Sequence, residues 1–144
     1  MKTFSEIPEK EKTLLLQFPA YISLLAVTHD HEMDKEEKNM AAWLTHIKTF
    51  STDPLLHTFY KAAELVFREN IETLDRQLPK TKTERDIAIR SALNVIENIL
   101  KNVDPGYAAA LHRSMRSYKS HISRAHRNIL EYFVFPMPIK GISD

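Results

Sequence analysis

The sequence contains no cysteine and only two glycines among its 144 residues. Without cysteine the chain can form no disulfide, no thiolate zinc site and no cysteine nucleophile, a composition that fits a reducing compartment. Strands, tight hairpins and phosphate-binding loops draw heavily on glycine, so its scarcity favours helices joined by short connections. We therefore expect an all-α protein.

A strong excess of charge and a long apolar run are also lacking. The formal net charge is +1 at pH 7, so any attraction to nucleic acid or anionic lipid must be local. The most apolar stretch, residues 14–27, is interrupted by Gln17 and Pro19 and is shorter than the ~20 residues that span a bilayer. The preceding segment has mixed charge and no signal-peptide pattern. We expect a cytoplasmic protein with no membrane span.

Apolar residues recur at spacings of three and four along almost the whole chain, which is typical of amphipathic helices. Pro19 should kink the first helix or split it into two, because proline lacks the amide donor that a helix interior needs. Asp53 and Pro54 have the character of an N-cap and a first helical position, where a helix restarts. Thr83 is predicted to cap a later helix. The predicted helices run from about 8 to 28, from 34 past 47, from 54 towards 78, from 83 until 102–106, and from about 107 to 133.

These helices predict a single bundle of about five to seven helices over residues 1–134, followed by an irregular tail, 135–144, that contains two prolines. The apolar stripe of each helix predicts its inward face. The third region places inward Leu55, Leu56, Phe59, Ala63 and Val66. The next places inward Ile89, Ala92, Leu93, Ile96, Leu100 and Val103. The last places inward Leu111, Met115, Tyr118, Ile122, Ile129 and Phe133. In the second helix, Trp43 is expected in the core.

The densest cluster of ionisable residues is the segment 29–37, with two histidines and five carboxylates. A turn between the first two helices would bring Asp30, Asp34 and Glu37 together, and carboxylate oxygens suit calcium, magnesium or manganese. Participation of His29 or His31 would shift the preference toward zinc, nickel or iron. Neither EF-hand spacing nor the H-E-x-x-H of zinc proteases is present. The alternative is a solvated helix corner, in which Asp34 is an N-cap and the acids interact with the helix dipole.

Residues 8–44 resemble the N-terminal half of a tellurite-resistance TerB-like domain. In that family an apolar helix leads to an Ala-Asp-Gly turn, an aliphatic residue, and a glutamate that opens the next helix. Asp30, Met33 and Glu37 match the turn aspartate, the aliphatic position and the glutamate, whereas His31 replaces the turn glycine.

The final residues, 141–144, resemble the start of the family's second acidic turn, and the chain stops before a matching glutamate. The resemblance implies a helical domain with two related halves and a divalent-cation site at Asp30, Asp34 and Glu37. It also implies a non-catalytic role in a stress response, mediated by protein partners.

The last helix provides a second candidate site, because residues 105–130 contain no acidic residue. At 100° per residue, four arginines fall on one face with Ser120, opposite the apolar stripe: Arg113, Arg116, Arg124 and Arg127. Such a row could bind phosphates of nucleic acid, a nucleotide or a lipid head group. The alternative is a solvated outer face that could also attract an acidic neighbour.

No catalytic residue is predicted. The sequence has no nucleophile elbow, and the histidines outside the acidic segment lack the i, i+4 pairing of a helical metal clamp. We expect ordinary surface or edge residues at His46, His57, His112, His121 and His126. The function predicted first is the TerB-like cation-binding module, and the alternative is phosphate or nucleic-acid binding by the last helix.

Overall fold

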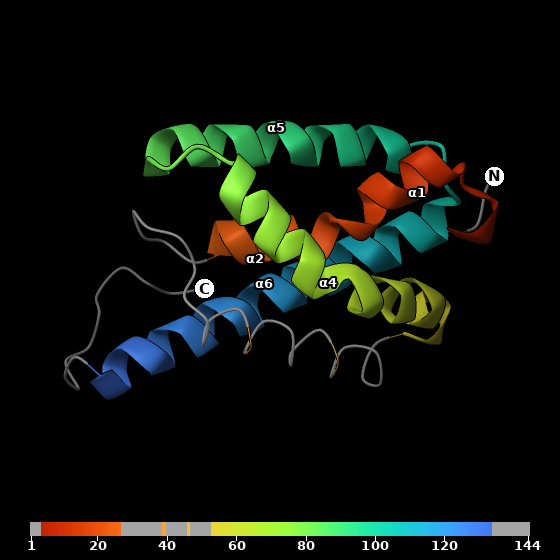
Figure 1. Cartoon of the computed structure of the whole chain (residues 1–144). Helices are drawn as coiled ribbons and strands as arrows, with labels where there is room; N and C mark the ends of the chain where they lie inside the picture. The colour runs from red at the N-terminus through yellow and green to blue at the C-terminus, as the bar shows by residue number, and fades with distance from the viewer. Residues whose placement is uncertain (1–3, 27–38, 40–45, 47–52, 134–144) are drawn as a thin grey trace.

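The computed structural model describes residues 4–26, 39, 46 and 53–133, and for 26 and 121–133 it describes the helical backbone alone. Within these residues the chain forms helices and no β-strand. The helices are α1 (Glu9–Leu16), α2 (Phe18–Ala26), α4 (His57–Gln77), α5 (Lys82–Leu100) and α6 (Pro105–Phe133) (Figure 1). The all-α prediction is confirmed for this part of the chain.

Two parts of the prediction lie outside the described residues. Of the second predicted helix only Asn39 and His46 are described, and both are helical. Trp43 and the tail 135–144 are not described. No helix in the described part of the chain is both long and apolar enough to cross a membrane.

Pro19 splits the first predicted helix into α1 and α2, as expected. The break falls at Gln17, whose backbone N–H donates to the Leu14 carbonyl over 3.1 Å and so tightens the end of α1. The hydroxyl of Ser23 donates to the Pro19 carbonyl over 2.8 Å. A proline in the second position of a helix leaves no intrahelical bond unmade, because the first N–H groups of a helix have no partner there. The split lets α1 and α2 take different directions (Figure 1).

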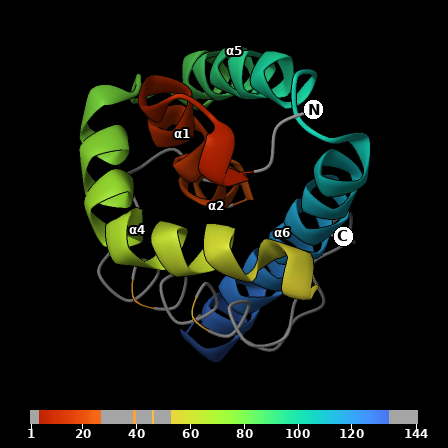
Figure 2. The ribbon, with the colours of Figure 1, turned by 90° about the vertical axis from the view of Figure 1, so that its right-hand side faces the viewer.

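Helix α2 lies at the centre of the described fold. It contacts α4, α5 and α6, and Figure 2 shows these three helices arranged around α1 and α2. Its composition explains this position, because a helix that is apolar on nearly every side must be covered on every side. The buried residues of α2 are Phe18, Pro19, Ala20, Ile22, Ser23 and Leu24.

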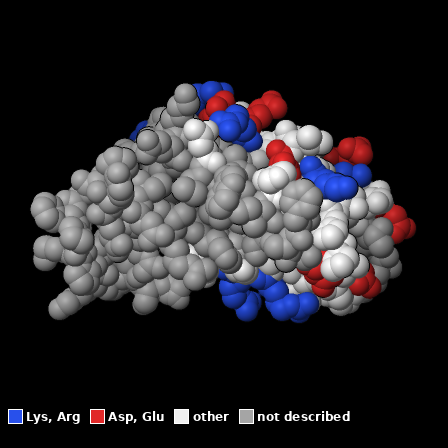
Figure 3. Space-filling view, turned by 90° about the horizontal axis from the view of Figure 1, so that it is seen from below, with Lys and Arg blue, Asp and Glu red and all other residues white. Residues whose placement is uncertain are grey.

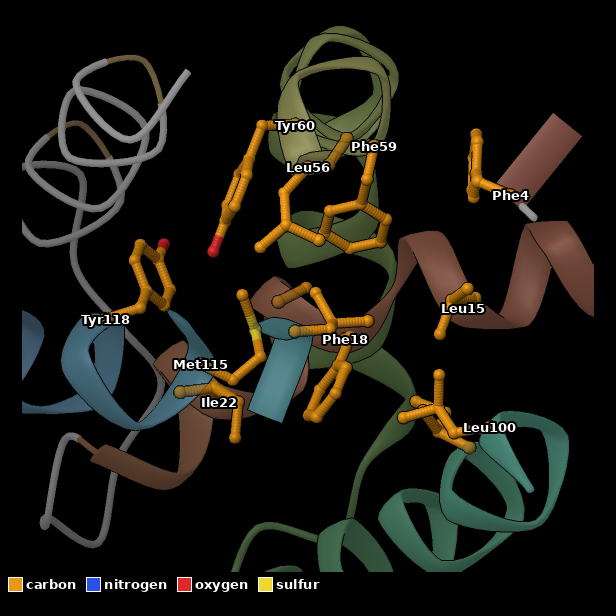
Figure 4. Close-up of a cluster of buried hydrophobic side chains, with 14 of the residues drawn as sticks. Phe4, Leu15, Phe18, Ile22, Leu56, Phe59, Tyr60, Leu100, Met115 and Tyr118 are labelled. Atoms are coloured by element: carbon orange, nitrogen blue, oxygen red, sulfur yellow. The ribbon is translucent and has the colours of Figure 1, made fainter. Parts of the chain in front are cut away.

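The core forms where the inward stripes of all these helices meet. Figure 4 shows side chains from each helix pointing into one cluster, with Phe59 near its middle. The ring of Phe59 makes edge-to-face contacts with Phe4, at 5.8 Å between centroids, and with Tyr60, at 5.2 Å. Such aromatic pairs add to the stabilisation from burial alone.

The restart at residue 53 is confirmed. The Asp53 carboxylate accepts the N–H of Leu55 at 2.9 Å, and Pro54 opens a one-turn 3₁₀ helix, η2 (Pro54–Leu56), that leads into α4. The prediction that Leu55 faces the core is wrong, since its side chain is 52% exposed while Leu56 is fully buried. A 3₁₀ turn winds with about three residues per turn, which shifts the phase relative to α4.

Helix α5 starts earlier than predicted. Its first residue is Lys82 and Thr81 occupies the N-cap position, so Thr83 is not the cap. The predicted stripe of α5 is confirmed, with Ala92 and Leu93 half-buried and the rest buried: Ile89, Ile96, Leu100 and Val103.

Helix α6 also begins slightly early, at Pro105. The Asp104 carboxylate accepts the N–H of Tyr107 at 3.1 Å, which satisfies one free donor of the first turn. Leu111, Met115 and Tyr118 are buried, as predicted. The last three members of the stripe, Ile122, Ile129 and Phe133, lie in the part of α6 where only the backbone is described.

Two substitutions on α4 test this core. Phe59 is fully buried and Leu65 is 87% exposed. We expect Phe59→Ala to lower the free energy of unfolding by about 3–5 kcal/mol, because it removes a buried ring and leaves a cavity. Leu65→Ala should change it by no more than about 0.5 kcal/mol. Urea denaturation of both variants measures the difference, and equal losses would contradict the described packing of α4.

Candidate functional site

Asp30, His31, Asp34 and Glu37, the predicted cation ligands, lie outside the described residues. In the part of the chain that is described, no three His, Asp or Glu side chains are grouped so that they could hold a metal ion. The proposal that these four residues bind a cation therefore rests on the sequence alone.

Two residues that follow this acidic segment in the sequence, Asn39 and His46, contact α4. The Arg68 guanidinium donates to the Asn39 side-chain oxygen at 3.0 Å, and His46 Nδ1 lies 2.7 Å from Glu64 Oε1. His46 is half-exposed, as expected of a surface histidine. In the sequence, the acidic corner (residues 29–37) thus lies between the end of α2 and Asn39, which contacts α4.

The cationic side chains of α6 are the candidate site that the structure describes in part. Arg113 and Arg116 are exposed, as predicted, and the structure adds Lys119, which is also exposed on α6. We call these three residues the α6 basic surface. Figure 3 shows a group of Lys and Arg side chains at the lower edge of that view, bordered on the right by acidic ones.

Two of the predicted anion-binding residues are described by their backbone only. Arg124 and Arg127 belong to the regular helix α6, so their positions continue the row of Arg113 and Arg116 along the helix axis. Ser120, also predicted on this face, is half-buried.

Acidic residues mark the N-terminal end of the α6 basic surface. His112 Nε2 lies 2.8 Å from both carboxylate oxygens of Glu97, which joins α6 to α5. Asp104 stands just before the first turn of α6. The positive charge therefore begins at Arg113 and extends toward the C-terminal part of the helix.

Buried hydroxyl groups form a second polar feature, inside the core. Tyr60 and Ser114 share a hydrogen bond of 2.5 Å between α4 and α6. Ser23 Oγ already donates to a backbone carbonyl, so the hydroxyl of Tyr118 donates to it over 3.0 Å, between α6 and α2. The hydroxyl of Tyr107 is buried and has no hydrogen-bond partner among the described residues.

Burial governs the chemistry of these tyrosines. It raises the pKa of Tyr60 and of Tyr107 well above the ordinary value of 10, because a buried phenolate would lose its hydration. Both phenols therefore stay protonated at neutral pH, and that of Tyr60 acts as a hydrogen-bonding group. Their arrangement suits the alignment of helices better than acid–base chemistry.

A buried ion pair joins α4 to α5. Arg85 pairs with the fully buried carboxylate of Asp75 and donates to the Pro79 carbonyl at 3.0 Å. Lys80 Nζ donates to the Asp75 carbonyl at 3.0 Å. Lys80 thereby satisfies a carbonyl in the last turn of α4 that has no partner within the helix, and Arg85 satisfies one just beyond the helix end. This pair was not predicted from the sequence. The available signal was the position of Asp75, four residues after the buried Ile71 and so on the inward side of α4.

The sequence matches no protein-family model, and searches of curated proteins and of solved structures find no match.

Tyr60, whose hydroxyl is hydrogen-bonded, and Tyr107, whose hydroxyl has no partner among the described residues, should respond differently to substitution by phenylalanine. Tyr60→Phe removes a buried hydrogen bond, so it should lower the free energy of unfolding by about 1–2 kcal/mol. Tyr107→Phe removes a buried hydroxyl that forms no described hydrogen bond, so it should leave stability unchanged or raise it slightly. Urea denaturation of both variants tests this pair, and a Tyr107→Phe loss as large as that of Tyr60→Phe would contradict the assignment.

Proposed function

We propose that the chain is a non-catalytic helical module that binds a phosphate-bearing anion through the α6 basic surface. The observation that supports this most is the exposure of Arg113, Arg116 and Lys119 on a helix with no acid between residues 105 and 130. Arginine and lysine are the side chains that bind phosphate most readily.

The neighbouring helices support this interpretation by contrast. Helix α4 has residues of both signs of charge, with Glu64, Glu69 and Glu72 between Lys61 and Arg76. Helix α5 likewise mixes acids with bases, including the ion pair of Lys82 with Asp86 at 3.1 Å. A solvated outer face in this protein thus has both signs of charge, whereas the outer face of α6 has one.

The α6 basic surface is also held rigidly, which favours binding. The opposite side of the same turns is buried in the core through Leu111, Met115 and Tyr118. A preorganised surface loses less conformational entropy on binding than a flexible segment would.

Charge reversal on this surface tests the proposal. We expect the double variant Arg113→Glu/Arg116→Glu to bind inorganic polyphosphate more weakly than the unmodified chain, with a salt dependence shallower by about two units of log K against log[salt]. Fluorescence anisotropy over a salt series measures both quantities.

The matched control is Arg90→Glu/Lys101→Glu, which makes the same change of net charge at exposed positions of α5 and at its C-terminal end. It should bind polyphosphate nearly as well as the unmodified chain. Equal weakening by the two double variants would show that only net charge matters and would remove the proposal.

We propose a second function for the acidic corner, supported by the residues that resemble a TerB-like domain. Asp30, Asp34 and Glu37 follow α2 in the chain, and the apolar character of that helix is part of the resemblance. A bound calcium, magnesium or manganese ion would offset the repulsion of the carboxylates, with zinc favoured if His31 takes part. This function would belong to a chemical-stress response with protein partners.

Thermal denaturation tests the cation site directly. A cation that binds only the folded state raises the melting temperature once its concentration exceeds the dissociation constant. We expect such a rise with at least one of calcium, magnesium, manganese or zinc, its reversal by chelator, and its absence in Asp30→Ala. The control Glu84→Gln, on the exposed side of α5, should keep the rise. No shift with any cation would remove this second proposal.

A further inference from the structure

We infer that the partner of the α6 basic surface is the phosphate backbone of a double-stranded nucleic acid, an inference that rests on the first proposed function. Four kinds of partner carry enough negative charge to be candidates: a duplex, a single strand, an acidic protein and a simple polyphosphate. The side chains exposed on α6 distinguish among them.

A single strand is disfavoured by the placement of the aromatic residues. Proteins that bind single strands stack the exposed bases on aromatic side chains. In the part of α6 whose side chains are described, the aromatic residues are Tyr107 and Tyr118, which are 4% and 0% exposed. The α6 basic surface therefore offers charge without a stacking platform.

An acidic protein is disfavoured by the placement of the exposed apolar residues. Protein interfaces are anchored by large apolar or aromatic side chains in their centre. The large exposed apolar side chains of the described residues lie in η2, α4 and α5, and none of them lies in α6: Leu55, Leu65, Ile87 and Val95. A protein docked on this surface would be held by rim-type charge pairs alone, which contribute little.

A duplex backbone fits what remains. Its two strands place one negative charge per ~1.7 Å of axis, so a rigid row of cations contacts several phosphates without reading any base. From Arg113 to Lys119 helix α6 rises ~9 Å, and the positions of Arg124 and Arg127 extend the row to ~21 Å. A row of this length can contact about three to five phosphates of the duplex.

The boundary of the surface also sets where the duplex lies. Asp104 precedes the first turn of α6 and Glu97 contacts His112, next to Arg113, so both carboxylates would repel phosphates on this side of the surface. The duplex should therefore contact α6 from Arg113 toward its C-terminal end. Because the contacts are made to phosphates, binding should depend strongly on salt and little on base sequence.

The experiment compares four probes on the full chain by fluorescence anisotropy: a short DNA duplex of arbitrary sequence, each of its separated strands, inorganic polyphosphate, and poly-glutamate. We expect the duplex to bind more tightly than either strand and than poly-glutamate, and a second duplex of unrelated sequence to bind equally. The slope of log K against log[salt] should be about −3 to −4.5, as three to five phosphate contacts require.

The variants provide the control for this result. Arg113→Glu/Arg116→Glu should weaken duplex binding about tenfold or more, because two phosphate contacts are lost. Arg90→Glu/Lys101→Glu should leave duplex binding unchanged. Equal melting temperatures of the two variants exclude loss of folding as the cause.

Each outcome has a separate meaning. Binding of polyphosphate without a preference for the duplex over its strands overturns the inference and leaves the proposed function in place. Poly-glutamate binding as tight as duplex binding overturns the inference in favour of an acidic protein. Failure of all four probes overturns the inference and the proposed function together.

Discussion

The burial of most of α2 is the constraint on which the rest of the described structure depends. This helix has no charged residue, and its apolar side chains each stabilise the fold by about 1.5–3 kcal/mol when water is excluded. That exclusion requires cover from several directions, which α4, α5 and α6 provide. The helix break at Pro19 is compatible with the burial of α2. The Ser23 hydroxyl donates a hydrogen bond to the Pro19 carbonyl, and α2 contains no charged residue.

Polar groups in the core then select one arrangement of the surrounding helices. Apolar contacts tolerate small rotations and shifts, whereas a buried hydroxyl or carboxylate that loses its partner costs about 1–3 kcal/mol or more. The bond of Tyr60 with Ser114 aligns α4 with α6, and that of Tyr118 with Ser23 aligns α6 with α2. The pair of Asp75 and Arg85 does the same for α4 and α5.

The functional proposals follow from this division between inside and outside. Because one side of α6 is fixed in the core, its other side presents a rigid row of cations on a protein whose net charge is only +1. Local charge of this kind supports contact with a backbone of regularly spaced phosphates, which requires position and sign of charge but no cleft. The proposed cation site at residues 30–37 differs from the α6 basic surface, because its ligands lie in the sequence between α2 and Asn39, which contacts α4.

Local rules in the sequence determined where helices break and which side of each is apolar. Pro19, the pair Asp53 and Pro54, and the segment 102–106 end or start helices because of their own backbone chemistry, so they are predictable without knowledge of the fold. The same holds for the arginine face of α6, which follows from the 100° period and the absence of acids. The predicted cation ligands remain a sequence-based hypothesis.

Only the tertiary structure decided which helices meet and which polar groups pair. Tyr118 and Ser23 are 95 residues apart, and Tyr60 and Ser114 are 54 apart. No spacing pattern relates such positions, because their contact depends on how whole helices cross. The inward turn of Leu56 in place of Leu55 has a similar origin, since η2 contacts both α4 and α6 and its 3₁₀ turn places Leu56 toward the core. The tendency of each segment to form a helix is a local property of the sequence. The contacts between helices, and the hydrogen bonds between their side chains, result from packing around α2.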